Sequence, residues 1–308
     1  MIRRGGLVAF PTETVYGLGA NALDRDAVLK IFEAKQRPAW DPIIVHAANL
    51  EMLRSLVREW PDKAQALAAK FMPGPLTLLL PKREIIPNEC TAGREKVGVR
   101  IPANPIALAL ISAAGTPIAA PSANRFGSTS PTTAAHVLRD LDGRIDAVLD
   151  GGECSVGVES TVLDPSLDPP VIYRPGGISR ERIELVIGAV KVATKSLDTS
   201  TPPESLPSPG LGIRHYAPRA KVVLVESEAE LQKTVTDVRA GVMLPEGWRS
   251  KGVVYDWGPL DHPETLARRL YFGLRWLDEQ GVSIIVCPLP SATGLGLAVR
   301  DRLLKAAK

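Results

Sequence analysis

Short apolar runs closed by turn residues recur along the first two thirds of the chain. Runs of this kind predict buried strands, which here lie at 7–10, 43–45, 76–80, 97–101, 118–120, 147–149, 161–163 and 171–173. Between them, apolar residues spaced three and four apart predict helices, such as one that Asp24 caps and Pro38 ends, and one over residues 62–71. This interleaving favours a layered α/β domain on a mixed sheet.

The composition changes near Lys195, where four prolines and several hydroxyl residues precede Ile213. Such a stretch predicts a semi-rigid linker. A second series of strands (222–225, 241–244, 282–287) and helices (228–239, 265–279 and the C-terminal end) follows it. We therefore predict a large α/β domain over residues 1–190, a linker over 191–218, and a small doubly wound, Rossmann-like domain over 219–308.

The charge and the cysteines restrict the class of protein. The 37 basic and 34 acidic residues give a net charge of only +3, which argues against a dedicated nucleic-acid coat, although a local basic patch stays open. Three cysteines, far apart, form neither a disulfide framework nor a metal-ligand pattern. No apolar run has the length of a membrane span, and the run at 7–10 is too short for a signal peptide. We expect a cytoplasmic protein.

Several common enzyme motifs are absent from the sequence. The glycines at 17–19 follow a strand and precede a helix, but no acidic residue ends the second strand as a dinucleotide site requires, so we expect them to allow a tight turn and close packing. There is no phosphate-binding P-loop motif, and Ser160 lacks the setting of a hydrolase nucleophile. The four histidines have no metal-ligand spacing, so we predict no metal held by the protein alone.

Two polar segments are candidates for a nucleotide site. Lys35 and Arg37 close the first helix just before Pro38, and two cations on one bend suit a polyphosphate, although they also suit the negative end of the helix dipole. Ser122 and Asn124 directly follow a buried strand, where ligands of open α/β sheets bind, although a simple polar turn is an equal alternative.

Taken together, the motifs are far more specific than any one alone. FPTETVYGLG at 10–19, KQRP at 35–38, PGPLT at 73–77, VRIP at 99–102, APSAN at 120–124, GVEST at 157–161 and RPG at 174–176 resemble the YrdC-like family, in family order. SPG at 208–210, HYAP at 215–218 and GLGLA at 294–298 resemble its two-domain members, the threonylcarbamoyl-AMP synthases. The resemblance covers nearly the whole chain. It implies a twisted mixed sheet with helices, then a linker and the small Rossmann-like domain.

The resemblance also implies an activity, a nucleotidyltransferase reaction. Family members join L-threonine, bicarbonate and ATP into threonylcarbamoyl-adenylate and pyrophosphate, with Mg²⁺ on the ATP. The product serves the t6A modification at adenosine 37 of tRNAs that decode codons beginning with A, so a downstream tRNA threonylcarbamoyltransferase complex is the expected partner. Such a reaction needs positioning and charge neutralisation rather than a protein nucleophile.

Site residues follow from the matched motifs. The L-threonine and bicarbonate pocket would be formed by Thr14, His46, Arg100, Ala120 and Ser160. ATP would be held by Lys35, Arg37, Asp41, Lys96, Ser122, Asn124, Ser130, Arg174, Ile213, His215 and Tyr216. The residues expected to carry catalysis are Lys35, Arg37, Arg100, Ser122 and Asn124. The linker would fold back as a lid over the nucleotide.

Two departures and two alternatives accompany this hypothesis. Only four residues precede Gly5, where relatives have a helix, and Asp41 stands where many have Asn. One alternative is a YrdC-like module that binds double-stranded RNA or tRNA without chemistry, and weak tRNA binding is compatible with either role. The other is an enzyme acting on a different carbamoyl-adenylate, which would need acylphosphatase and zinc-finger segments that this sequence lacks.

Overall fold

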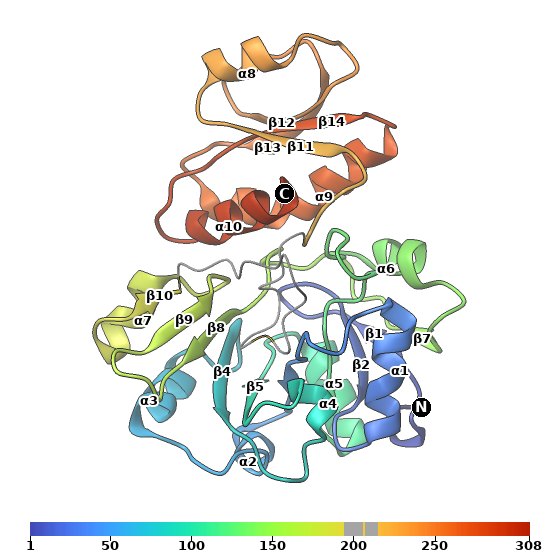
Figure 1. The fold of residues 1–308 in the computed structure, drawn as a ribbon, viewed down its shortest axis with the longest axis vertical. Coiled ribbons are helices and arrows are strands. Elements are labelled where there is room, and N and C mark those ends of the chain that lie inside the picture. Colours follow the sequence, from blue (N-terminus) through green and yellow to red (C-terminus); the bar gives the residue numbers. More distant parts are fainter. Residues whose placement is uncertain (194–205, 207–214) are drawn as a thin grey trace.

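The computed structural model describes residues 1–193, Leu206 and residues 215–308. These form a large α/β unit and a smaller one stacked on it (Figure 1). The predicted fold class is thereby confirmed. The predicted linker falls largely outside the described residues. Its first two residues form strand β10 (Lys191–Val192), which extends the large sheet beside β9 (Val171–Arg174).

The large unit is a mixed sheet, ten-stranded within the described residues, in the order β10-β9-β8-β4-β5-β3-β6-β2-β1-β7. Its remaining strands are β1 (Val8–Phe10), β2 (Gly17–Asn21), β3 (Val45–His46), β4 (Leu76–Pro81), β5 (Lys96–Arg100), β6 (Ile118–Ala119), β7 (Ala147–Val148) and β8 (Thr161–Asp164). The helices are α1 (Arg25–Lys35), α2 (Leu50–Arg54), α3 (Asp62–Phe71), α4 (Asn88–Thr91), α5 (Pro105–Ala114), α6 (Ala134–Leu141) and α7 (Arg180–Ile187), after a 3₁₀ turn at Ile2–Arg4.

Strand β1 shows why the strands appear as continuous apolar runs. Successive side chains of a strand point to opposite faces of the sheet. Ala9 belongs to the core that contains Val28 of α1, whereas Val8 and Phe10 belong to the core that contains Ile111 of α5. Both faces are therefore covered by helices, and no position of the strand is left for a polar residue.

Strand β2 corrects the prediction for the glycine segment. Gly17 and Gly19 lie within a strand that pairs antiparallel with β1, not in a tight turn. The close packing expected of them is present, because a Cβ at Gly19 would lie 2.8 Å from Phe10 and from Ile118. Glycine is required here by the neighbours of the strand rather than by the backbone conformation.

The small unit is a parallel sheet in the order β11-β14-β12-β13. Its elements are β11 (Lys221–Val225), α8 (Glu228–Thr234), β12 (Gly241–Pro245), β13 (Val253–Gly258), α9 (Pro263–Glu279), β14 (Ile284–Pro288) and α10 (Gly296–Ala306). Helices α9 and α10 lie between this sheet and the large unit, and α8 covers the opposite face (Figure 1). The Rossmann-like prediction is confirmed, but β13 was not predicted and α8 is shorter than the predicted helix at 228–239.

Helix α9 packs directly on the large unit at Gly157. A Cβ at this position would lie 2.4 Å from the Cα of Arg268 and 2.5 Å from the carbonyl oxygen of Ala267. Gly157 also has a φ of +79°, which favours glycine on its own account. At this position the backbones of the two units therefore meet directly.

Candidate active site

A pocket of about 550 Å³, counting the space at its open mouth, lies where the large unit meets the start of the small one. Most of the predicted site residues line it, namely Thr14, Arg37, His46, Arg100, Ala120, Ser122, Ser160, Arg174, His215 and Tyr216. These residues come from segments spread over the whole large unit and from the end of the linker. The fold therefore gathers positions that the sequence keeps far apart.

One edge of the sheet supplies three of the pocket residues. Strand β5 ends at Arg100, β9 ends at Arg174, and Ser160 immediately precedes β8. Strand β4 runs antiparallel to β5 and parallel to β8, while β8 and β9 are antiparallel, so these ends lie at the same edge. The Ser160 hydroxyl is hydrogen-bonded to that of Thr77 at 2.8 Å, which fixes its direction.

Arg100 is a buried cation with an organised environment. Its Nη2 donates to Glu13 at 2.5 Å and its Nη1 donates to the Thr14 hydroxyl at 3.2 Å. Within the described part of the chain its Nε has no hydrogen-bond partner. Burial lowers the pKa of Arg100 while Glu13 raises it, and an arginine keeps its charge in either case. A buried guanidinium with a spare donor is suited to receive an anion.

His46 lies beside Arg100 on the neighbouring strand, in parallel register with it. Burial, followed by the charge of Arg100, lowers the pKa of His46 to about 3. The imidazole is therefore neutral at physiological pH, and its Nδ1 has no partner among the described residues. A neutral ring can exchange hydrogen bonds with a substrate without adding charge next to Arg100.

Arg37 and Arg174 bring two further cations to the pocket. The Arg37 guanidinium is held by the carbonyl oxygens of Asp41 and Pro42 and by the Asp41 carboxylate at 3.0 Å. The Arg174 guanidinium donates twice to the carbonyl oxygen of Ser160 and once to its hydroxyl. Both side chains are at most 8 % exposed and donate to backbone carbonyl oxygens, so they are held in place before a ligand binds.

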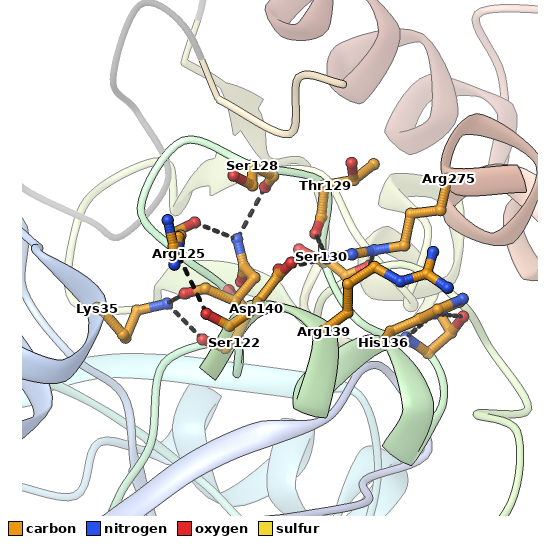
Figure 2. Close-up of polar contacts among 12 residues, drawn as sticks. Lys35, Ser122, Arg125, Ser128, Thr129, Ser130, His136, Arg139, Asp140 and Arg275 are labelled. Atoms are coloured by element: carbon orange, nitrogen blue, oxygen red, sulfur yellow. Dashed lines mark hydrogen bonds and ion pairs between the residues drawn. The ribbon is translucent and has the colours of Figure 1, made fainter. Parts of the chain in front are cut away.

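The position of Lys35 on the bend before Pro38 predicts a contact with phosphate, but Lys35 does not line the pocket. Its ammonium is buried and donates to the carbonyl oxygens of Ser122 and Asn124, beneath the loop that follows β6 (Figure 2). Asn124 in turn donates to the carbonyl oxygens of Arg125 and Ser128. Of the pair Ser122 and Asn124, only Ser122 lines the pocket. Lys35 thus shapes the loop from which Ser122 projects.

The remaining predicted ATP residues are less close to the pocket. The Ser130 hydroxyl donates to Glu159, one of the pocket residues, at 2.6 Å. Lys96 binds Asp164 and Ser166 at the far end of β5 and is not brought to the pocket. Ile213 lies outside the described residues.

Two carboxyl groups, Glu159 in the pocket lining and Glu13 behind Arg100, received no role from the sequence. Glu13 holds Arg100, and Glu159 lies between the pocket and the small unit, where the side chains of Tyr271 and Arg302 donate to it. Both stand inside matched motifs, so the motifs were a usable signal. Arg302 had no such signal, because it lies in a charged stretch of the last helix, a pattern that is typical of a solvent-exposed face.

The comparisons with known proteins agree along the whole chain. Residues 1–176 match the Sua5_yciO_yrdC family model, described as telomere recombination, and residues 178–308 match the C-terminal domain of threonylcarbamoyl-AMP synthase. The chain is 48% identical to the threonylcarbamoyl-AMP synthase of Pyrococcus abyssi, covering 99% of this chain and 91% of that one. It is 47% identical to the enzyme of that name from Bacillus subtilis, over 100% and 91% of the two chains.

The fold is also that of a solved structure. The crystal structure of P. abyssi Sua5 complexed with L-threonine superposes with a TM-score of 0.94 at 46% identity, covering 99% of this chain and 92% of that one. A structure of E. coli YciO, at 27% identity and a TM-score of 0.50, matches 57% of this chain and 85% of its own. The two-unit arrangement is therefore shared with the first of these proteins.

Proposed function

The chain belongs to the Sua5/YciO/YrdC family, and on that premise we propose that it joins L-threonine, bicarbonate and ATP into threonylcarbamoyl-adenylate, with release of pyrophosphate. It is a transferase that forms an adenylate. The observation that carries the proposal is the pocket with three buried arginines, Arg37, Arg100 and Arg174. Every substrate of the reaction bears negative charge, so a pocket of buried, fixed cations suits all of them together.

The pocket divides into two ends. We assign Thr14, His46, Arg100 and Ser160, the threonine end, to the amino acid and bicarbonate, with Arg100 facing a carboxylate. We assign Arg37, Ser122, Arg174, His215 and Tyr216, the nucleotide end, to ATP. Ala120, which also lines the pocket, belongs with the threonine end, and a Cβ at the neighbouring Gly17 would come within 3.2 Å of it.

The chemistry needs no covalent enzyme intermediate. The threonine amine attacks the carbon of bicarbonate and forms a carbamate with loss of water. A carbamate oxygen then attacks the α-phosphorus of ATP, and the bond from that phosphorus to the bridging oxygen breaks to release pyrophosphate. Arg100 holds the amino acid, Arg37 and Arg174 neutralise charge on the phosphates, and the neutral His46 adds no positive charge beside Arg100.

Magnesium fits this pocket as a companion of the nucleotide. Among the described residues no group of three or more His, Cys, Asp or Glu side chains could hold a metal ion. The carboxylates at the pocket are already engaged, Glu13 with Arg100, Asp41 with Arg37 and Glu159 with Arg302. We infer that Mg²⁺ is carried mainly by triphosphate oxygens, where it would neutralise charge on the phosphates.

The catalytic role is favoured over a module that only binds RNA, because relatives close to half identical over the whole chain are named as enzymes. We propose that the product goes to a tRNA threonylcarbamoyltransferase that makes t6A. In the described part of the chain no helix is long and apolar enough to cross a membrane. The three cysteines are buried and unpaired, which supports our assignment to the reducing cytoplasm.

Pyrophosphate release tests the proposal. Purified protein with ATP, Mg²⁺, L-threonine and bicarbonate should release pyrophosphate, and omission of threonine should abolish that release. Degassed buffer without bicarbonate should reduce it in the same way, because the carbamate cannot form. Release that continues equally without threonine would contradict the assignment.

A further inference from the structure

Two buried arginines of the small unit reach into the large one. Arg275 of α9 donates to the carbonyl oxygens of Thr129 and Ser130 and pairs with Asp140 (Figure 2). Arg302 of α10 is 1 % exposed and contacts Glu159 and Tyr216 of the pocket. Of the two, only Arg302 contacts residues that line the pocket.

The contacts of Arg302 converge from three segments. Its Nε donates to the Glu159 carboxylate at 2.7 Å. Its Nη1 donates to the carbonyl oxygen of Pro175 at 3.0 Å. The guanidinium carbon also lies 5.1 Å from the centroid of the Tyr216 ring, in cation–π contact with it.

Each of these contacts lies at, or one residue from, a pocket position. Glu159 and Tyr216 line the pocket themselves, Glu159 precedes Ser160, and Pro175 follows Arg174. Within the described residues Arg302 is absent from the pocket lining. It therefore stands behind the wall as a common anchor for segments that belong to β8, β9 and the end of the linker.

The energetics favour a geometric role. A buried ion pair costs desolvation of both charges, and replacing it with apolar groups of similar volume is often neutral or stabilising. Replacement of Arg302 alone differs from this case, because it leaves the buried Glu159 carboxylate without its cation. An apolar residue at position 302 could fill the space, but it could not fix a carboxylate, a carbonyl and an aromatic ring in one arrangement. The planar fork of arginine can, because its donors have fixed directions.

We propose that Arg302 is a positioning residue, through which the small unit sets the geometry of Ser160, Arg174 and Tyr216 for the transfer of the adenylate. The proposal rests on the proposed function and deepens it. Arg302 touches no substrate, and it acts by holding the wall from which the substrate contacts project. Displacing such contacts by about 1 Å lowers the rate of an enzyme about 100-fold.

The test compares two arginines of the same helix in the full chain. Arg302→Met removes the anchor. Arg300→Met is the matched control, since the Arg300 guanidinium bonds Pro290 and Glu226 within the small unit. We expect Arg302→Met to keep the circular dichroism spectrum and to lower kcat for pyrophosphate release about 100-fold, with KM for both substrates changed less than about 3-fold. The control should stay within about 2-fold of the parent.

A second readout does not depend on activity. Hydrogen–deuterium exchange of backbone amides should become faster in Arg302→Met at 158–162, 172–176 and 215–217, and unchanged at 96–100. If the parent protein shows no threonine-dependent release, the proposed function fails while this measurement still tests the anchor. If Arg302→Met does not fold, Arg302→Lys replaces it, because lysine keeps the charge but not the fork. A folded variant with parental kcat and parental exchange overturns the proposal.

Discussion

The two ends of the pocket are built by different means. At the threonine end, His46, Arg100 and Ser160 stand at or next to the ends of strands of one sheet. The Ser160 hydroxyl bonds Thr77 of that sheet, and Arg100 bonds Glu13 in the loop between β1 and β2. At the nucleotide end, Ser122 projects from a loop held by Lys35, and Tyr216 comes from the linker and packs on Arg302 of the small unit. The threonine end is therefore built mainly from strand ends of one sheet and the loop at Thr14, whereas the nucleotide end joins Arg174 at the end of β9 to a loop and to the small unit.

This difference has consequences for how each end responds to change. A strand end is fixed by ladder hydrogen bonds on both sides, so the loss of one side chain removes a contact without moving its neighbours. A loop held by one buried cation moves when that cation is lost. We therefore expect substitutions at the threonine end to act on one substrate, and substitutions behind the nucleotide end to act on ATP alone or on the rate.

Arg100→Met should have the largest effect. Removing this buried cation leaves Glu13 without its partner, and breaking such a pair costs about 3–5 kcal/mol of stability. The loss of the carboxylate contact should lower kcat/KM for threonine about 1,000-fold. Titration calorimetry should show threonine binding lost while ATP binding persists.

The double variant Arg100→Met/Glu13→Gln separates folding from function. It leaves no buried unpaired charge, so we expect its unfolding free energy to recover while threonine binding stays lost. Normal threonine binding by either variant would mean that threonine binds elsewhere, and would contradict the division of the pocket into two ends.

Lys35→Met should have an intermediate effect, confined to the other end. The loop at Ser122 and Asn124 would lose two charged hydrogen bonds, each worth roughly 1.5–3 kcal/mol. We expect kcat/KM for ATP to fall about 30-fold with threonine binding unchanged. Lys30→Met is the control, because the Lys30 ammonium on the same helix binds only the carbonyl oxygen of Gly5 among the described residues. A fall in threonine binding for Lys35→Met would show that the ends are not independent.

The smallest expected effect is on the stability of the protein at acidic pH. Burial, then the charges of Arg275 and Arg139, lowers the pKa of His136 to about 3, from an ordinary value of 6.5. The unfolded chain binds a proton below about pH 6.5 that the folded protein refuses until about pH 3, so stability falls as the pH drops through that window. At pH 5 this difference in proton binding at His136 lowers the free energy of unfolding by about 2 kcal/mol.

His136→Gln should remove this loss of unfolding free energy, whereas the corresponding loss due to His46 at the threonine end should remain. Urea unfolding of the parent protein and of the variant, at pH 7 and at pH 5, measures the loss in each. We expect the loss of unfolding free energy between these pH values to be about 2 kcal/mol smaller in the variant. An equal loss in both proteins would mean that protonation of His136 does not oppose folding.

The sequence predicted the sheet-based part of the molecule well. The helix at 62–71 has the predicted ends, and strand β4 extends the predicted run by one residue. In both cases local periodicity and the flanking prolines carry the information. Helix α5 was missed even though its signal was present, since Asn104 caps it and Pro105 occupies its first turn.

What escaped prediction depends on contacts between distant segments. Strand β2 was taken for a turn because the reason for its glycines is Phe10 and Ile118, which become neighbours only in the fold. The site residues taken from the motifs remain predictions, and the structure brings ten of them to one pocket while leaving Lys96 away from it. No local pattern indicates that Arg302 lies behind Glu159, because the two meet only when both units have folded.

The contact at Gly157 limits how the small unit of this chain could be exchanged for that of a relative. Helix α9 lies so close to this glycine that the two backbones fit as a matched surface, with no side chain to absorb a change in the path of either. A hybrid that joins residues 1–176 of this chain to the C-terminal domain of a relative would therefore be limited by the course of one helix rather than by overall identity. Hybrids that preserve the approach of α9 to Gly157 should assemble, and in those that shift it by a single side-chain diameter the two units should fold without packing on each other.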